Sequence, residues 1–359
     1  MNRGWTIRRF RALVTLALVL SGVGLAPSSA AESPMEHDSP SLHAPHHESG
    51  RYFNPWARRS VSFFDLLKWQ IFSRNPYDKS APLQVPRVAN DGARLSGVEH
   101  SATVTWVGHA TFAVHDEGDV FLTDPHFGAR AMIPRRLVPP GIPIESVPAH
   151  SFAMVSHNHY DHLDAWSVDH LPASMPWFVP MGLGEWFRKR GRANVVELDW
   201  WQSVQHGRFT ITCLPAQHWS RRGLNDIDET LWCSWLVDSG QRRYFFAGDT
   251  GYFPGFAEYG ERFGPIDVAM LPIGAYEPRW FMRSQHMDPA EAYQAFLDLR
   301  AGHMIAMHWG TFDLTDEPAD LPPRVLAEAV RARGGDASRT VVLAIGEQWH
   351  VPDGAAGPD

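Results

Sequence analysis

The sequence predicts an α/β domain in which helices lie outside a sandwich of two mixed sheets. Two observations lead to this class: antiparallel hairpin signals alternate with strand–helix units, and no repeat period runs through the chain. With 359 residues, 44% of them hydrophobic, the chain can bury a large core in one or two domains. The formal charge of −8 and the lack of a concentrated basic stretch argue against nucleic acid as a partner.

Strands are expected where short apolar or alternating runs end at turn residues. Residues 103–114 and 119–123 form a hairpin pattern around His115-Asp116-Glu117-Gly118. Further strands are expected at residues 152–155, 177–179, 194–198, 208–214, 231–237, 243–247, 304–307 and 340–345. Helices are expected at residues 183–190, 288–300 and 324–333, the second opened by the capping sequence Asp288-Pro289-Ala290-Glu291.

Residues 1–30 have the pattern of a secretory signal peptide. Four arginines precede an apolar run over residues 12–26, and the small residues Ser28-Ser29-Ala30-Ala31 follow it. A transmembrane anchor is the alternative, but the run is shorter than the ~20 residues that a span needs. We therefore expect an exported protein that is periplasmic or envelope-associated and peripheral to the membrane.

Two segments separate this signal from the folded domain. Residues 31–50 are rich in Ser, Pro and His and are expected to form a disordered linker. Residues 51–75 interleave aromatic and basic side chains, a composition that suits a membrane interface. A helix docked on its own domain is an equal alternative. The expected helix covers residues 60–73, and its apolar face would carry Phe63, Leu66, Leu67 and Ile71.

Potential metal ligands are concentrated directly after the apolar strand at residues 152–155. His157 and His159 would share one face if the strand continues, and Asp161 and His162 follow after a turn. Such a dense histidine cluster is costly to bury unless a metal or a carboxylate compensates it. Four ligands suffice for one tetrahedral ion, and with further residues they could be shared between two ions.

Three other expected strands also end at a potential ligand: His218, Asp249 and His308. Ligand sites in α/β proteins lie beyond the carboxyl ends of strands, so we expect these residues to converge with the first cluster. Seven imidazole and carboxylate ligands without a thiolate indicate a two-ion site that suits zinc, with iron and manganese as alternatives.

These residues resemble the signature of the metallo-β-lactamase superfamily, carried by His157-Asn158-His159-Tyr160-Asp161-His162 together with His218, Asp249 and His308. Within it, the chain looks like the N-acyl-phosphatidylethanolamine-hydrolysing phospholipase D family over roughly residues 51–350. The motifs that carry this closer resemblance include Asn54-Pro55-Trp56, Trp106-Val107-Gly108-His109-Ala110-Thr111, Gly274-Ala275-Tyr276-Glu277-Pro278-Arg279-Trp280-Phe281 and Gln285-His286-Met287-Asp288-Pro289.

The resemblance implies an αββα hydrolase domain over residues 51–355 with two zinc ions. His157, His159 and His218 would bind one ion and Asp249 would bridge the two. The second ion would be bound by Asp161, His162 and His308. The expected reaction is hydrolysis of an N-acyl-phosphatidylethanolamine-like lipid to an N-acylethanolamine and phosphatidic acid, so the expected partners are a phospholipid and a membrane surface.

Further roles are expected around these ligands. Asp161 would orient the nucleophile, and His286 would contact the phosphate or protonate the leaving oxygen. Gln285 and Tyr160 would contact substrate, and Asp124 would orient a ligand histidine from behind.

Several alternatives stay open at this point. The same metals could serve a lactonase or a different phosphodiesterase, because one fold hosts many hydrolyses. A non-catalytic metal-binding envelope protein is the alternative outside enzymes, and a homodimer is open. Cys213 and Cys233 could form a disulfide in an oxidising compartment or remain two buried thiols.

Overall fold

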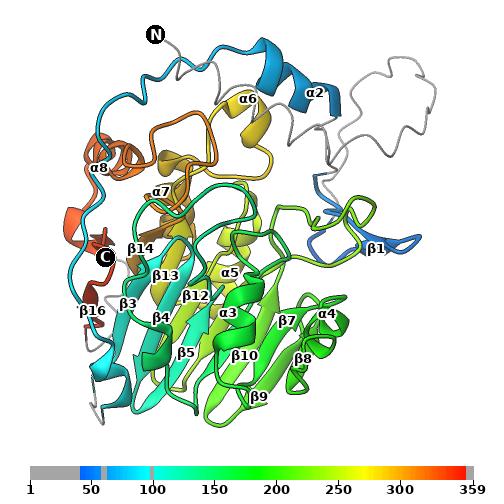
Figure 1. The fold of residues 1–359 in the computed structure, drawn as a ribbon, viewed down its shortest axis with the longest axis vertical. Helices are drawn as coiled ribbons and strands as arrows, with labels where there is room; N and C mark the ends of the chain where they lie inside the picture. Colours follow the sequence, from blue (N-terminus) through cyan, green and yellow to red (C-terminus); the bar gives the residue numbers. More distant parts are fainter. Residues whose placement is uncertain (1–40, 58–62, 98–100, 353–359) are drawn as a thin grey trace.

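The protein is a sandwich of two seven-stranded sheets, as expected (Figure 1). It is seen in a computed structural model that describes residues 41–57, 63–97 and 101–352, so the expected signal peptide lies outside the described residues. No helix among these residues is long and apolar enough to cross a membrane.

The first sheet contains both antiparallel and parallel neighbours. An antiparallel β3–β4–β5 meander is followed by parallel β6, β7 and β8, and β16 from the far end of the chain pairs with β3. Its strands, in spatial order, are β16 (Gln348–His350), β3 (Thr103–Gly108), β4 (Thr111–Asp116), β5 (Asp119–Thr123), β6 (Phe152–Met154), β7 (Trp177–Pro180) and β8 (Val195–Leu198).

The second sheet repeats this mixture, with antiparallel β9 to β12 and parallel β12 to β15. Its strands, in spatial order, are β15 (Thr340–Val341), β14 (Ala301–Met307), β13 (Ile266–Pro272), β12 (Arg243–Phe246), β11 (Ser234–Asp238), β10 (Phe209–Leu214) and β9 (Ser203–His206). In the first sheet, strands β3, β5 and β6 run in the same direction, so their carboxyl ends lie at one edge of that sheet. In the second sheet the same holds for β10, β12 and β14.

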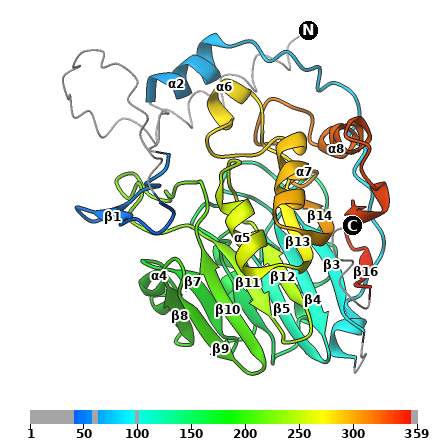
Figure 2. The same cartoon turned by 180° about the vertical axis from the view of Figure 1, so that it is seen from behind.

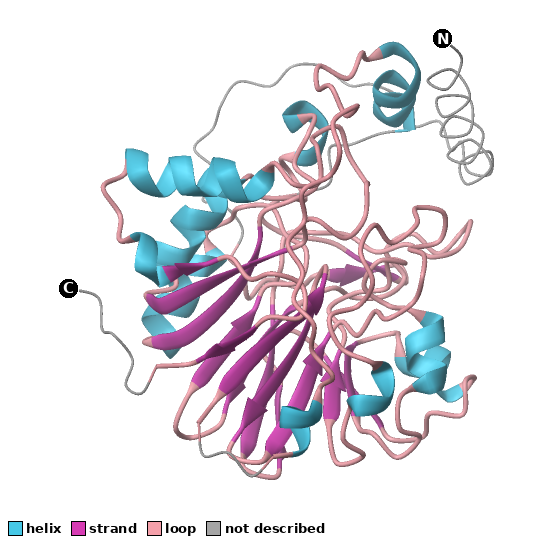
Figure 3. Cartoon of the chain, turned by 60° about the vertical axis from the view of Figure 1, so that its left-hand side comes forward, coloured by secondary structure: helices cyan, strands magenta, loops and turns pink. Residues whose placement is uncertain are grey.

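Helices cover the outer face of each sheet (Figures 2 and 3). On the first sheet, α3 (Ala165–His170) and α4 (Gly184–Arg188) bury Val168 and Phe187 in one apolar cluster with strand residues such as Val120. On the second, α7 packs on β13 and β14, with α5 and α8 beside it. These three helices are α5 (Gly255–Phe263), α7 (Pro289–Asp298) and α8 (Pro322–Ala332).

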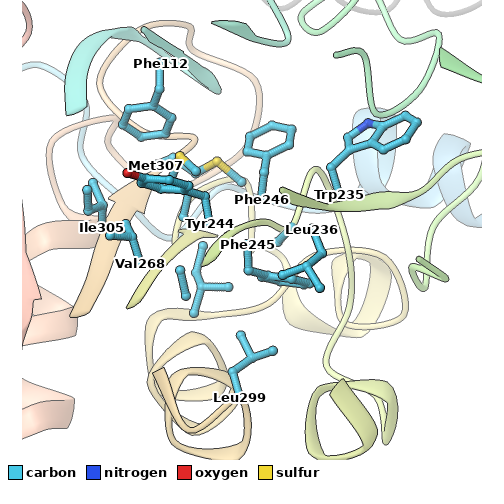
Figure 4. Close-up of a cluster of buried hydrophobic side chains, with 14 of the residues drawn as sticks. Phe112, Trp235, Leu236, Tyr244, Phe245, Phe246, Val268, Leu299, Ile305 and Met307 are labelled. Carbon is cyan, nitrogen blue, oxygen red and sulfur yellow. The ribbon is translucent and has the colours of Figure 1, made fainter. Parts of the chain in front are cut away.

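The main core lies between the sheets (Figure 4). Successive side chains of β12 point to opposite faces of its sheet, as in any strand. Tyr244 faces the first sheet, with its ring 5.5 Å from that of Phe121. Phe245 points the other way, towards α5, and its ring lies 5.9 Å from that of Tyr259. Strand β12 therefore contributes to both layers of the core. Full burial of each such aromatic side chain contributes about 1.5–3 kcal/mol to stability.

Several strand predictions were wrong in their bounds; the strand expected at residues 231–237, for example, begins at Ser234. Residues 103–114 are not one strand, because the chain turns between β3 and β4 at Gly108 and His109, which have φ of +128° and +55°. The expected strand at residues 340–345 is limited to β15. Elements that were not predicted include strands β9, β13 and β16, helices α3 and α5, and α6 (Arg279–Met282).

The prediction of a disordered linker over residues 31–50 was wrong for residues 41–50; residues 31–40 lie outside the described residues. We call residues 41–57 the N-terminal strap. It contains the short hairpin β1 (His47–Glu48) and β2 (Arg51–Tyr52), and the ring of His46 stacks on Trp200 with centroids 4.2 Å apart. The strap continues into the domain, where Asn54 Nδ2 donates to Ala216 O at 2.7 Å.

The segment after the strap docks on its own domain, which is one of the two alternatives for residues 51–75. The membrane-interface alternative stays a prediction. Helix α2 (Phe63–Leu67) continues as the π-helical turn η1 (Lys68–Phe72), in which Ser73 N donates to Lys68 O. Trp69 docks on Phe281 of α6 (Arg279–Met282), with ring centroids 5.1 Å apart. Because a π-turn is wider than an α-turn, the apolar face expected from 3.6-residue spacing is not maintained, and Ile71 is exposed.

Candidate metal centre

Six strands end beside one another at the same end of the sandwich, and each is followed by a polar side chain of the site. The turn at Gly108 presents His109, and Asp124 follows β5 directly. The other four strands, β6, β10, β12 and β14, lead to His157, His218, Asp249 and His308. The convergence expected from strand ends is therefore present.

The first cluster contains His157, His159, His218 and Asp249, whose ligand atoms lie within 4.8 Å of one another. His159 Nδ1 is 2.8 Å from His157 Nε2 and 3.2 Å from His218 Nε2. Burial lowers the pKa of His159 to about 4 and that of His218 to about 3, and it holds the pKa of His157 well below its ordinary value. All three imidazoles are thus neutral and offer lone pairs to a cation.

The second cluster contains His109, Asp161, His162 and His308, again within 4.8 Å. Asp249 joins the two clusters, because its Oδ2 lies 3.0 Å from His162 Nε2 and its Oδ1 lies 3.1 Å from His308 Nε2. Burial opposes the charged form of Asp249, but the imidazoles of His162 and His308 outweigh it and hold the pKa well below its ordinary range. An ionised carboxylate therefore lies between the clusters.

The residues fit a pair of metal ions. The Nε2 atoms of His159, His162 and His308 and Oδ1 of Asp249 are buried, and none makes a hydrogen bond of good geometry within the described part of the chain. Buried polar atoms normally find a partner, so converging orphan donors and acceptors indicate an ion between them. Nitrogen and carboxylate ligands without thiolate suit zinc, iron or manganese. The buried clusters therefore form a binuclear metal site.

Asp124 lies behind His162, as expected for a residue that orients a ligand. Its Oδ2 accepts from His162 Nδ1 at 2.6 Å, and its other oxygen accepts from the backbone N–H of Ser156 at 2.6 Å. This contact fixes the ring of His162 with Nε2 turned towards Asp249.

Gln285, for which a substrate contact is expected, lies against His218 and lines the cavity beside it. Its backbone carbonyl lies 3.0 Å from His218 Nδ1, and its buried amide Nε2 lies 3.7 Å from Met282 Sδ. The structure thus gives Gln285 the role of orienting His218 through its main chain.

His286 lies between the two clusters. Its ring centroid is 5.2 Å from that of His218 and 5.6 Å from that of His308, and it can share an ion position with His308 and Asp249. Burial lowers its pKa to about 3, and its Nδ1 has no hydrogen-bond partner among the described residues. A neutral imidazole is therefore available at the centre of the site.

Tyr160, expected at the entrance, contacts Arg222. Its hydroxyl donates to the carbonyl of Arg222 at 2.9 Å, and the guanidinium of Arg222 lies 4.1 Å from the centre of its ring. The same guanidinium donates from one nitrogen to Asn158 O at 3.0 Å and to Leu163 O at 2.7 Å. Arg222 thus ties together Asn158 and Leu163, and three of the potential ligands lie between these two residues.

Substituting lysine for Arg222 is expected to lower the free energy of unfolding by about 2 kcal/mol, because a lysine cannot bond both carbonyls and stack on Tyr160 together. Urea unfolding of the purified protein measures this change. Arg221→Lys is the matched control, since the Arg221 guanidinium bonds the nearby carbonyls of Gly223 and Leu224. Equal stability of the two variants would contradict the role assigned to Arg222.

His109 is the site residue that sequence reasoning missed. It stands in the quoted motif Trp106-Val107-Gly108-His109-Ala110-Thr111, but a continuous strand over residues 103–114 places it in mid-strand, away from any strand end. Gly108 followed by a polar residue was the available signal for a turn.

The site backbone is strained at three non-glycine residues. His109, Asp124 and His308 have φ of +55°, +34° and +64°, a left-handed backbone conformation that residues other than glycine rarely adopt. Such strain costs on the order of 1–3 kcal/mol for each residue and clusters at functional sites. Gly274 accommodates the strained turn after β14, since a Cβ on it would lie 2.0 Å from His308 O.

A family model described as "Beta-lactamase superfamily domain" matches residues 120–309, which include both clusters except His109. The chain belongs to the metallo-β-lactamase superfamily. Within this superfamily the chain is 40% identical over 330 residues to N-acyl-phosphatidylethanolamine-hydrolyzing phospholipase D 1 of Caenorhabditis elegans, covering 85% of this chain and 92% of that protein. It is 36% identical over 256 residues to the mitochondrial N-acyl-phosphatidylethanolamine-hydrolyzing phospholipase D of Saccharomyces cerevisiae, covering 68% and 54%.

Solved structures support the fold. A possible metal-dependent hydrolase from Veillonella parvula matches with a TM-score of 0.59 at 17% identity, covering 69% of this chain and 99% of that one. The expected fold and family are thus confirmed, and the protein is a metal-dependent hydrolase of the metallo-β-lactamase superfamily related to these phospholipases.

Proposed function

We propose that the protein is a two-zinc phosphodiesterase of the phospholipase D type, which hydrolyses N-acyl-phosphatidylethanolamine-like lipids to an N-acylethanolamine and phosphatidic acid. The observation that carries this proposal is the combination of a binuclear site with 40% identity to a phospholipase of that specificity over 85% of the chain. The similarity extends well beyond the ligands.

The ligand set is part of the proposal. His157, His159 and His218 would hold one ion, and Asp249 would bridge to the second. Asp161, His162 and His308 would complete the second position. Bound there, the metals would lower the pKa of a coordinated water towards ~7 and neutralise charge on the phosphate.

The protein residues then supply orientation. The oxygen of water attacks phosphorus, the bond from phosphorus to the N-acylethanolamine oxygen breaks, and the proton that the attacking water loses is balanced by one that the leaving oxygen takes up from solvent. Asp161 orients the attacking water through its carboxylate. Because burial keeps His286 neutral, its ring N–H suits a hydrogen bond to a phosphate oxygen better than transfer of a proton to the leaving group.

A cavity beside the first cluster offers room for part of the substrate. It has a volume of about 180 Å³, and its walls combine the aromatic side chains of Phe53, Trp219 and Trp232 with polar ones such as Gln217 and Gln285. Ligand pockets pair hydrophobic and aromatic walls with polar groups that fix orientation. The N-acylethanolamine part of the substrate, which has an apolar chain and a polar amide, would fit here.

The segment after the strap would deliver the protein to the lipid surface. Phe64, Phe72 and Trp280 are 76%, 79% and 48% exposed, and Lys68 Nζ lies 4.8 Å from the ring of Trp280. We name these side chains of α2, η1 and α6 the aromatic patch; in Figure 1, α2 and α6 lie at the same end of the molecule. Exposed aromatic residues beside a cation suit the interface of a bilayer. An exported, periplasmic or envelope-associated location, peripheral to the membrane, belongs to this proposal.

The double variant Phe64→Ser and Phe72→Ser is expected to weaken binding to phospholipid vesicles at least about tenfold, since each lost phenylalanine contributes about 1.5–3 kcal/mol on burial. Vesicle co-sedimentation measures the binding. Turnover of bis-(p-nitrophenyl) phosphate should stay unchanged. Leu297→Ser, on the exposed face of α7, is the control. Unchanged sedimentation of the double variant would exclude the aromatic patch from membrane binding.

Mass spectrometry of an N-acyl-phosphatidylethanolamine digest in ¹⁸O-labelled water tests the reaction itself. We expect N-acylethanolamine without label and phosphatidic acid that carries one ¹⁸O, because water attacks phosphorus. Release of diacylglycerol would show that the bond between phosphorus and the glycerol oxygen is cleaved, which would contradict the proposed reaction. The absence of product from protein shown to hold two metal ions would contradict it as well.

A further inference from the structure

His109 is a buried residue of the site to which neither the ligand set nor the proposed reaction gives a role. Its side chain is 1% exposed, and its Nε2 lies 3.0 Å from Asp161 Oδ2. The other two imidazole nitrogens near that oxygen, Nε2 of His308 and of His162, lie further away, at 3.5 and 3.6 Å. Of these three histidines, His109 thus lies closest to Asp161.

The contact is a hydrogen bond from imidazole to carboxylate. A carboxylate only accepts, so the proton lies on Nε2 of His109 and that nitrogen has no lone pair left for a metal. Each carboxylate oxygen can accept in two directions, so Asp161 Oδ2 keeps a lone pair for another partner. In the second cluster, His109 therefore donates a hydrogen bond through Nε2, whereas Asp161 can accept that bond and still bind a metal ion.

The backbone of His109 is fixed from three directions. Its N–H donates to Thr311 Oγ1 at 2.6 Å, and its carbonyl accepts from Trp106 Nε1 at 3.0 Å and from His308 N at 3.1 Å. The last bond joins the turn after β3 in the first sheet to the end of β14 in the second. The left-handed conformation of His109, with φ of +55°, is thus held in place by both sheets.

The ring is fixed as well. Its centroid is 4.0 Å from that of His308 and 5.1 Å from that of Phe312. A rigid donor of this kind removes the rotational freedom of the carboxylate that it bonds, which is how supporting residues raise the affinity of metal ligands.

We propose that His109 is a positioning residue that holds Asp161 in the orientation needed to bind the second metal ion. The proposal rests on the ligand set given under the proposed function, but not on the identity of the substrate. It gives a role to a histidine outside the family match at residues 120–309.

Zinc titration of the metal-free protein by calorimetry tests the proposal without any substrate. His109→Leu should lower the affinity for one of the two zinc ions by about 10–100-fold, while the other ion binds as before. His109→Gln should bind both ions with nearly the wild-type affinities, since its side-chain amide can donate to the same oxygen.

His115→Leu is the matched control. His115 is equally buried, and its Nε2 lies 3.0 Å from a backbone carbonyl, that of Gly97, at a distance from the site. This variant should lose stability and still bind two zinc ions. The proposal is overturned if His109→Leu binds both ions normally, if His109→Gln loses as much affinity as His109→Leu, or if His115→Leu loses the same ion. Failure of the lipid digest would leave these results unaffected.

Discussion

Replacing Asp249 with asparagine is expected to lower kcat/KM for phosphodiester hydrolysis by at least about a thousandfold. Asp249 approaches both clusters, because its Oδ2 lies 3.8 Å from His157 Nε2 in the first and 3.0 Å from His162 Nε2 in the second. An amide has nearly the same shape, but it carries no charge and offers only one acceptor atom. The two positions would lose the group that couples them.

Turnover of bis-(p-nitrophenyl) phosphate, together with zinc content by atomic absorption, measures this effect. Asp238→Asn in β11 of the same sheet is the control, because Asp238 pairs with Arg243 at 2.8 Å and lies outside both clusters. Its activity should remain close to wild type. An Asp249→Asn protein that retains a tenth of the activity would show that the bridging role is wrong.

Removing the metals is expected to lower the free energy of unfolding by about 4 kcal/mol, measured relative to protein with free zinc a thousandfold above its dissociation constant. The physical reason lies in the buried imidazoles. Nε2 of His159 lacks a hydrogen bond within the described chain, so without a cation its lone pair is desolvated and uncompensated.

Scanning calorimetry with and without a chelator measures this loss, and added zinc should restore the wild-type transition. The Asp249→Asn variant should respond less to the chelator than the wild type. A transition temperature that is independent of chelator, in protein that loses its zinc, would show that the metal does not contribute to folding.

The ligands of the site could be predicted because each stands at a visible sequence boundary. His218 and His308 follow apolar runs, and the spacing of His157 and His159 can be recognised in the sequence without knowledge of the fold. His109 could not be placed in the same way, since its turn depends on a left-handed Gly108 and on bonds to Trp106 and Thr311. Backbone conformation of this kind leaves only a weak trace in sequence.

Other parts of the site depend on contacts that sequence does not encode locally. Gln285 acts through its carbonyl, which every residue has, so its residue type gave no hint of the contact with His218. Strand β16 forms because Trp349 pairs with Val104, far away in the chain. The hairpin of β4 and β5 and helix α7 were predicted well because their signals are local, as in the capping box of Asp288 and Glu291.

The N-terminal strap has a consequence for the order in which the molecule is completed. Asn54 and Trp56 bond Ala216 and Gln217, on the loop that carries His218, across 162 and 161 residues of sequence. During synthesis the strap therefore emerges long before its partners exist, and such distant contacts close slowly. The earliest-made part of the described chain is then fixed among the last, and the first metal position gains its outer support only once translation has passed that loop.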